Sequence, residues 1–172
     1  MSTLSSIFLV GPMGAGKSAV GRQLGRLLNM EFIDSDDEIE RRTGVDIAFI
    51  FEKEGEQGFR DRESRVIDEL SQRQGIVLAT GGGVVMRDEN RNCLAARGFV
   101  VYLQTSVEQQ WQRTSKGRHR PLLLREDPKA ALQELMDLRE PLYKDLADLV
   151  VDTDGRKVGS VAGEIARCVN EG

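Results

Sequence analysis

The sequence predicts an α/β fold in which a five-stranded parallel sheet lies between two layers of helices. Short β-rich runs alternate with longer amphipathic segments along the 172 residues. Runs such as IVLA and FVVYL are apolar on both faces, as in strands that helices cover on both sides. A chain of this length buries one substantial core. We therefore expect a three-layer sandwich in a single domain that spans residues 1–172.

In chain order, the expected strands are 7–10 (IFLV), 31–34, 76–80, 99–103 and 149–152, and the expected helices are 17–28, 38–42, 59–74, 89–97, 107–114, 129–138 and 158–169. Asp88 can cap the helix that follows it, Gly98 can end that helix, and Pro128 suits a helix start. Sheets of this kind bind ligands at the carboxyl ends of their strands. Residues directly after each strand are therefore the first candidates for a site.

The charge balance excludes some classes of partner. Lys and Arg number 24 against 28 Asp and Glu, so no global positive field attracts nucleic acid or anionic lipid. The N-terminal MSTLSSIFLV lacks a basic region and runs directly into a glycine loop, which favours neither a signal peptide nor a membrane anchor. We expect a cytoplasmic monomer without nucleic-acid or membrane partners.

A phosphate-binding loop follows the first strand. GPMGAGKS at 11–18 satisfies G-x-x-x-x-G-K-[ST] between a strand and a helix. Its backbone N–H groups and the helix N-terminus suit phosphate, Lys17 supplies a charge for the β- and γ-phosphates, and the Ser18 hydroxyl suits Mg²⁺. The expected nucleotide contacts here are Gly14, Ala15, Gly16, Lys17, Ser18 and Ala19. The alternative is a tight glycine turn with a solvated lysine, and the loop alone does not separate kinase, ATPase and GTPase.

Three aspartates surround the end of the second strand in FIDSDDE, residues 32–38. A helix-start carboxylate favoured by the helix dipole would explain one of Asp36 and Asp37. Mg²⁺ prefers one or two protein carboxylates and retains waters, so Asp34 near Ser18 is a candidate metal ligand. Asp36 would then face the acceptor, orient its hydroxyl and take its proton.

Several motifs together resemble the shikimate kinase family: DSD at 34–36, FRDRE at 59–63, TGGG at 80–83, RPLL at 120–123 and LREPLY at 138–143. The resemblance runs in order from the first strand to the final helix. It implies a P-loop kinase fold with strand order 2-3-1-4-5, ATP with one Mg²⁺, and phosphorylation of the 3-hydroxyl of shikimate in chorismate and aromatic amino-acid biosynthesis. The alternatives are a related small-molecule kinase, such as one for gluconate, and a nucleotide-operated switch without an acceptor pocket.

The resemblance also implies how the acceptor is held, with a shikimate-binding segment at about 34–63. Arg60 and Arg139 grip the shikimate carboxylate, Gly82 touches the ring through its N–H, and Asp36 binds ring hydroxyls. Spacing alone leaves other interpretations open. Arg60 and Glu63 could form a solvated helical salt bridge, and TGGG could be a flexible turn.

The basic segment RTSKGRHRPLL at 113–123 has neither strand nor helix character around Gly117. Such a segment is ordinarily a solvated loop, but in a phosphate enzyme it predicts a mobile lid at about 113–125. By resemblance, Arg120 stabilises the γ-phosphate region and joins Lys17 and Asp36 as a catalytic residue. Arg113 would stack on adenine, although a solvated helix end is equally open, and Arg156 in TDGRK would lie beside the base.

Overall fold

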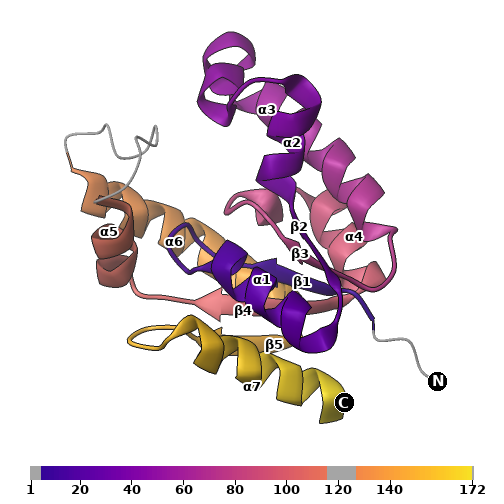
Figure 1. Cartoon of the computed structure of the whole chain (residues 1–172). Helices are drawn as coiled ribbons and strands as arrows, with labels where there is room; N and C mark the ends of the chain where they lie inside the picture. The colour runs from indigo at the N-terminus through magenta and orange to yellow at the C-terminus, as the bar shows by residue number, and fades with distance from the viewer. Residues whose placement is uncertain (1–4, 116–126, 172) are drawn as a thin grey trace.

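The computed structural model describes residues 5–115 and 127–171 (Figure 1). One five-stranded, all-parallel sheet has the order β2-β3-β1-β4-β5. Its strands are β1 (Ile7–Val10), β2 (Glu31–Asp34), β3 (Ile76–Ala79), β4 (Phe99–Gln104) and β5 (Leu149–Asp152). The fold class and the strand order predicted from the sequence are confirmed.

Helices cover both faces of the sheet, as Figure 1 shows. On one face lie α1 (Lys17–Leu28) and α7 (Val158–Glu171), and on the other lie α3 (Ile47–Ser71), α4 (Asp88–Arg97) and α6 (Pro128–Leu146). Successive residues of a strand point to opposite faces, so Phe8 and Val10 join the core beneath α3, α4 and α6, whereas Ile7 and Leu9 join the core beneath α1 and α7. The remaining elements are α2 (Ser35–Thr43), α5 (Val107–Ser115) and the short 3₁₀ helix η1 (Val84–Met86).

The strand register brings the carboxyl ends of the strands to one edge. Ala79 pairs with both Leu9 and Asp34, and Gln104 pairs with Asp152. The Thr80 hydroxyl donates to the Leu9 carbonyl at 2.8 Å and fixes the exit of β3 against that of β1. The segments that follow β1, β2 and β3 therefore start side by side.

Several helices are longer than the sequence pattern predicted, α3 and α6 by the most residues. α3 begins at Ile47 rather than at residue 59, and Gly55, with φ 73° and ψ 179°, interrupts its helical backbone. α6 continues through Pro141 to Leu146 rather than ending at 138, because Tyr143 and Leu142 still pack against the sheet. Asp88 is the first residue of α4 and not its cap, which is Arg87.

None of the described helices combines the length and the apolar character that a membrane crossing requires.

Candidate active site

The loop after β1 has the backbone of a phosphate cradle. Gly11, Gly14 and Gly16 have φ values of 149°, 81° and 88°, which side chains rarely tolerate. A Cβ added to Gly11 would also lie 2.6 Å from the Leu103 carbonyl oxygen. α1 begins at Lys17 without a side-chain cap, so no capping side chain occupies the N–H groups of its first turn. The arrangement suits an anion at the start of α1.

Lys17 and Ser18 connect this loop to its surroundings. The Lys17 ammonium donates to the carbonyl oxygens of Gly11 at 2.6 Å and Pro12 at 2.8 Å. The Ser18 hydroxyl donates to Oδ2 of Asp34. The loop lysine thus folds back over its own loop, and the hydroxyl meets the end of β2.

Asp34 divides its two carboxylate oxygens between α1 and α2. Oδ2 accepts from Ser18, while Oδ1 accepts from the backbone N–H groups of Asp36 at 2.9 Å and Asp37 at 3.1 Å. Asp34 is therefore the N-cap of α2, which starts three residues earlier than the pattern predicted. The cap fixes Asp36 at the start of that helix.

Arg60 and Glu63 form a buried ion pair on α3. Nη1 of Arg60 donates to Oε1 of Glu63 at 2.9 Å, and the exposed fractions of the two side chains are 14% and 0%. This is not the solvated helical salt bridge that the spacing left open. Burial raises the pKa of the Glu63 carboxyl, with the charges of Arg60 and Arg139 acting in the opposite direction.

The TGGG segment after β3 lies among these charged groups. A Cβ added to Gly81 would lie 2.8 Å from Oε2 of Glu63 and 3.0 Å from Oδ1 of Asp36. Within the described residues, Oε2 of Glu63 is buried without a hydrogen-bond partner. A side chain at Gly81 would displace one of these two carboxylates, so the glycine lets both approach the loop.

The two arginines predicted to hold the acceptor lie against neighbouring glycines. A Cβ added to Gly83 would lie 2.6 Å from Cζ of Arg60, and one added to Gly82 would lie 3.5 Å from Nη1 of Arg139. Nε of Arg139 is buried and has no hydrogen-bond partner among the described residues. Arg60 and Arg139 thus meet at one short loop although they come from different helices.

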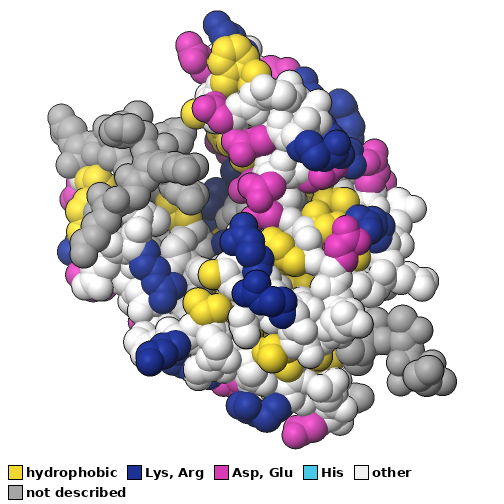
Figure 2. Space-filling model, viewed as in Figure 1, with side chains coloured by type: hydrophobic (Ala, Val, Ile, Leu, Met, Phe, Trp, Pro, Cys, Tyr) yellow, Lys and Arg dark blue, Asp and Glu magenta, His cyan; other side chains and the backbone are white. Residues whose placement is uncertain are grey.

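The same loop borders the phosphate cradle. The Cβ position of Gly82 lies 3.6 Å from the Met13 nitrogen and 3.7 Å from the Gly11 oxygen. A narrow cleft is lined by Pro12 and Met13 of the loop and by Arg139 and Tyr143 of α6. Figure 2 shows the surface hollowed between the α2–α3 lobe and the body that carries α1, with acidic and basic side chains at its rim. Phosphate loop and arginine pair therefore share one side of the molecule.

The other predicted nucleotide contacts are distributed unevenly. Arg113 of α5 donates from Nη1 to the Gly14 carbonyl at 2.8 Å and so lies against the phosphate loop. Ala15 of that loop is buried, and Ala19 in the first turn of α1 is exposed. Arg156 instead binds the Asp152 carbonyl, Ser160 and Glu164, the last at 2.8 Å. Its guanidinium thus engages the end of β5 and α7. Arg120 and most of the predicted lid lie outside the described residues.

Two side chains that the sequence pattern did not single out tie the loop after β5 to the start of α5. Asp154 accepts from the Thr105 hydroxyl at 2.8 Å and from the Ser106 N–H at 3.0 Å. Gly155 donates its N–H to Oε1 of Gln109 at 3.0 Å. No spacing rule connects these positions, because β4 and β5 become neighbours only in the folded sheet.

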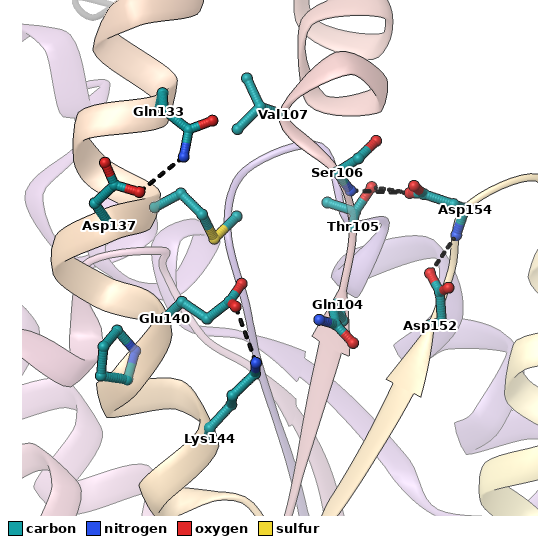
Figure 3. Close-up of a pocket in the computed structure, with 12 residues that line it drawn as sticks. Gln104, Thr105, Ser106, Val107, Gln133, Asp137, Glu140, Lys144, Asp152 and Asp154 are labelled. Atoms are coloured by element: carbon teal, nitrogen blue, oxygen red, sulfur yellow. Dashed lines mark hydrogen bonds and ion pairs between the residues drawn. The ribbon is translucent and has the colours of Figure 1, made fainter.

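A separate cavity of about 720 Å³ lies between α6 and the ends of β4 and β5. Figure 3 shows Asp137 and Glu140 reaching toward it from α6, and Asp152 and Asp154 on its far wall. Lys144 is paired with Glu140 at 3.0 Å. The carboxylates outnumber this one lysine, and none of the predicted site residues lines the cavity.

Comparison with known proteins identifies the family. A family model described as shikimate kinase matches residues 13–170. The chain belongs to the shikimate kinase family. The family predicted from the sequence is thereby confirmed, and so is the prediction that the protein is a kinase.

Curated shikimate kinases align over nearly the whole chain. The one from Pasteurella multocida (strain Pm70) is 54% identical over 171 residues, covering 99% of this chain and 98% of the relative. The one from Thioalkalivibrio sulfidiphilus (strain HL-EbGR7) is 58% identical over 167 residues, covering 97% and 88%. The shared length includes every segment that forms the site described above.

Solved structures of shikimate kinases have the same fold. The Acinetobacter baumannii enzyme, solved in complex with shikimate, has a TM-score of 0.96 and 50% identity, with 98% of this chain and 94% of that chain covered. The Aquifex aeolicus enzyme has a TM-score of 0.84 and 35% identity, with 97% and 96% covered.

Proposed function

We propose that this protein transfers the γ-phosphoryl group of ATP to the 3-hydroxyl of shikimate. The observation that carries the proposal is the meeting of Arg60 and Arg139 at Gly83 and Gly82, directly beside the phosphate loop. A nucleotide-operated switch has no need of two guanidinium groups there. The Acinetobacter relative, solved with shikimate, supports the same acceptor.

The acid end of the acceptor is held by the two arginines. Planar guanidinium groups bind a carboxylate through paired, charge-assisted hydrogen bonds that lysine does not reproduce. Nη1 of Arg60 binds Glu63 at 2.9 Å and Nε lies 3.8 Å from the Glu56 carboxylate, which leaves Nη2 to donate to a ligand. Nε of Arg139 is buried and has no hydrogen-bond partner within the described part of the chain, so it is a further donor for an anion.

The hydroxyl end faces the start of α2. Asp36 is fixed there by the Asp34 cap and lies beside Gly81, next to the glycine that borders the phosphate loop. Its carboxylate orients the attacking hydroxyl and takes the proton late, as suits a loose transition state in phosphoryl transfer. Asp36, Arg60, Gly82 and Arg139 together form the acceptor site in this proposal.

The phosphate end is held by the loop and the N-terminus of α1. Their N–H groups bind the phosphate oxygens, and Lys17 exchanges its carbonyl partners for the β- and γ-phosphates. Ser18 and Asp34 fit one Mg²⁺, because a hydroxyl and a carboxylate already in contact present oxygen ligands at the correct end of the loop. The ion, when bound, neutralises charge on the phosphates.

The rest of the nucleotide site follows from the sequence. Arg113 of α5, which contacts the phosphate loop at Gly14, is proposed to contact the adenine, and Arg156 to lie near it. Arg120 is proposed to stabilise the transferring phosphoryl group from a lid at about 113–125. A single domain, a monomer and a cytoplasmic location complete the proposal.

An acceptor screen tests this function. With ATP and Mg²⁺, shikimate should accelerate ADP release by orders of magnitude over water. Gluconate is the matched alternative acceptor, because it also carries a carboxylate and several hydroxyls. Equal turnover on the two acids, or a rate of ADP release that neither acid changes, would reject the proposal.

A further inference from the structure

A buried tyrosine of α6 tethers the glycine loop of the acceptor site. The Tyr143 hydroxyl donates to the Gly82 carbonyl at 2.5 Å, and the tyrosine is fully buried. Tyr143 lies four residues after Arg139 and therefore on the same face of the helix. One face of α6 thus delivers both a guanidinium group and a hydroxyl to Gly82.

This hydrogen bond reaches Arg60 through the peptide that follows Gly82. A planar peptide carries the Gly82 carbonyl and the Gly83 N–H together, so fixing one orients the other. Gly83 is the residue against which the Arg60 guanidinium packs, with 2.6 Å between Cζ and the position of an added Cβ. Consecutive glycines have wide conformational freedom, so a tether from outside the loop is needed to hold one geometry.

The tyrosine ring is itself held, and its hydroxyl remains a donor. It stacks on Tyr102 with 5.0 Å between ring centroids and 25° between ring planes. Burial raises the pKa of Tyr143 to about 12, against the opposing charge of Arg139, so the phenol keeps its proton at neutral pH. A protonated phenol donates to the carbonyl, which a phenolate does not.

Tyr102 provides a matched comparison within the same stack. It is also fully buried, but its hydroxyl donates to Oε2 of Glu140 at 3.1 Å and not to the glycine loop. Removing the Tyr102 hydroxyl deletes its bond to Glu140, whereas removing the Tyr143 hydroxyl deletes its bond to Gly82 and its contact with Arg139; both changes keep the ring stack. Only the change at Tyr143 releases Gly82.

We propose that Tyr143 is a positioning residue of the acceptor site: its hydroxyl fixes the Gly82 carbonyl, and through it the loop on which Arg60 and Arg139 converge. The role rests on the proposed function, because the acid that the two arginines hold is shikimate. Tyr143 does not touch the acceptor. It sets the geometry in which the two guanidinium groups reach one carboxylate.

The test compares Tyr143→Phe with Tyr102→Phe in steady-state kinetics. Tyr143→Phe should raise the KM for shikimate about tenfold, the size expected when a buried carbonyl loses its donor. Its kcat and its KM for ATP should stay within about twofold, because the phosphate loop is untouched. Tyr102→Phe should leave all three constants within about twofold of wild type.

Amide hydrogen exchange tests the tether without using turnover. The Val84 N–H donates to the Gly81 carbonyl and the Met86 N–H to the Gly83 carbonyl, both at 3.1 Å, so these amides report on the order of the loop. Their exchange should be about tenfold faster in Tyr143→Phe and unchanged in Tyr102→Phe. If wild type does not phosphorylate shikimate, the function fails while this measurement still decides the tether.

Three results would overturn the proposal. One is an unchanged shikimate KM together with unchanged exchange in Tyr143→Phe. Another is an equal rise in shikimate KM in Tyr102→Phe. The third is loss of the fold in Tyr143→Phe, because the hydroxyl would then hold the protein together and not the site.

Discussion

The guanidinium of Arg60 hydrogen-bonds the fully buried carboxylate of Glu63 at 2.9 Å while its other side packs against Gly83. A buried carboxylate is costly unless it is paired. The pair therefore fixes the arginine in one place and, with Nε paired to Glu56 at 3.8 Å, leaves Nη2 for a ligand.

Arg60→Ala should weaken the binding of shikimate. Removing one partner of a buried charge pair typically costs about 2 to 5 kcal/mol, so the KM for shikimate should rise about 30-fold or more. Arg62→Ala is the control, because Arg62 pairs with Glu54 at 2.7 Å on the surface. Steady-state kinetics that showed equal effects for the two variants would contradict the acceptor role of Arg60.

Gly83→Ala should disturb the acceptor site through Arg60. The added Cβ would meet the guanidinium, which has to move away from its present position. The KM for shikimate should rise about tenfold or more, while the KM for ATP changes little. Gly159→Ala in α7 is the control, since nothing lies within 4 Å of its added Cβ. A wild-type shikimate KM in Gly83→Ala would refute the placement of Arg60.

Lys17→Ala should lower kcat steeply without unfolding the protein. Removing a cation that stabilises transferring charge typically costs about 10²- to 10³-fold in kcat. The free energy of unfolding should change by only about 1 kcal/mol, because the ammonium binds two carbonyls at the edge of the sheet. Arg26→Ala, at the exposed end of α1, should change neither quantity. Near-normal turnover in Lys17→Ala would contradict the phosphate cradle.

The stability of the protein should depend on pH through Glu63. Burial raises the pKa of its carboxyl above the ordinary value of 4.5, so the folded state holds this proton at pH values where the unfolded state has lost it. The free energy of unfolding contributed by Glu63 is therefore largest below pH 4.5 and falls as the pH rises through the folded-state pKa.

Glu63→Gln isolates this effect because the amide does not titrate. Urea unfolding across a pH series should show the wild-type free energy of unfolding falling relative to that of the variant as the pH rises above 4.5. A difference that is independent of pH, or that grows in favour of the wild type, would mean that Arg60 and not burial dominates this carboxyl.

Local patterns predicted much of the fold. The inner strands β1, β3 and β4 lie where apolar runs stand in the sequence, because a strand covered on both faces has to be apolar at nearly every position. The edge strands β2 (EFID) and β5 (LVVD) are less buried and carry charged residues. The turn at 11–18 follows from its glycines, which adopt the positive φ values that the motif requires. α3 and α6 were predicted too short, since Gly55 and Pro141 interrupt the helical pattern and tertiary packing overrides both.

The site was predictable only as far as local spacing reaches. Arg60 and Glu63 are three residues apart, so their contact could be anticipated, but its burial depends on the β3 loop beside it. The contact of Tyr143 with Gly82 joins α6 to the end of β3, and no periodicity connects those positions. Such contacts follow from the order of strands in the sheet.

The most direct test of whether the nucleotide and the acceptor bind side by side is a crystal structure with ADP, Mg²⁺ and shikimate. Guanidinium N–H groups of both Arg60 and Arg139 should lie within hydrogen-bond distance of the shikimate carboxylate, and its 3-hydroxyl should face the phosphate loop beside Asp36. A carboxylate bound by neither arginine, or a hydroxyl turned away from the loop, would contradict the proposed acceptor site.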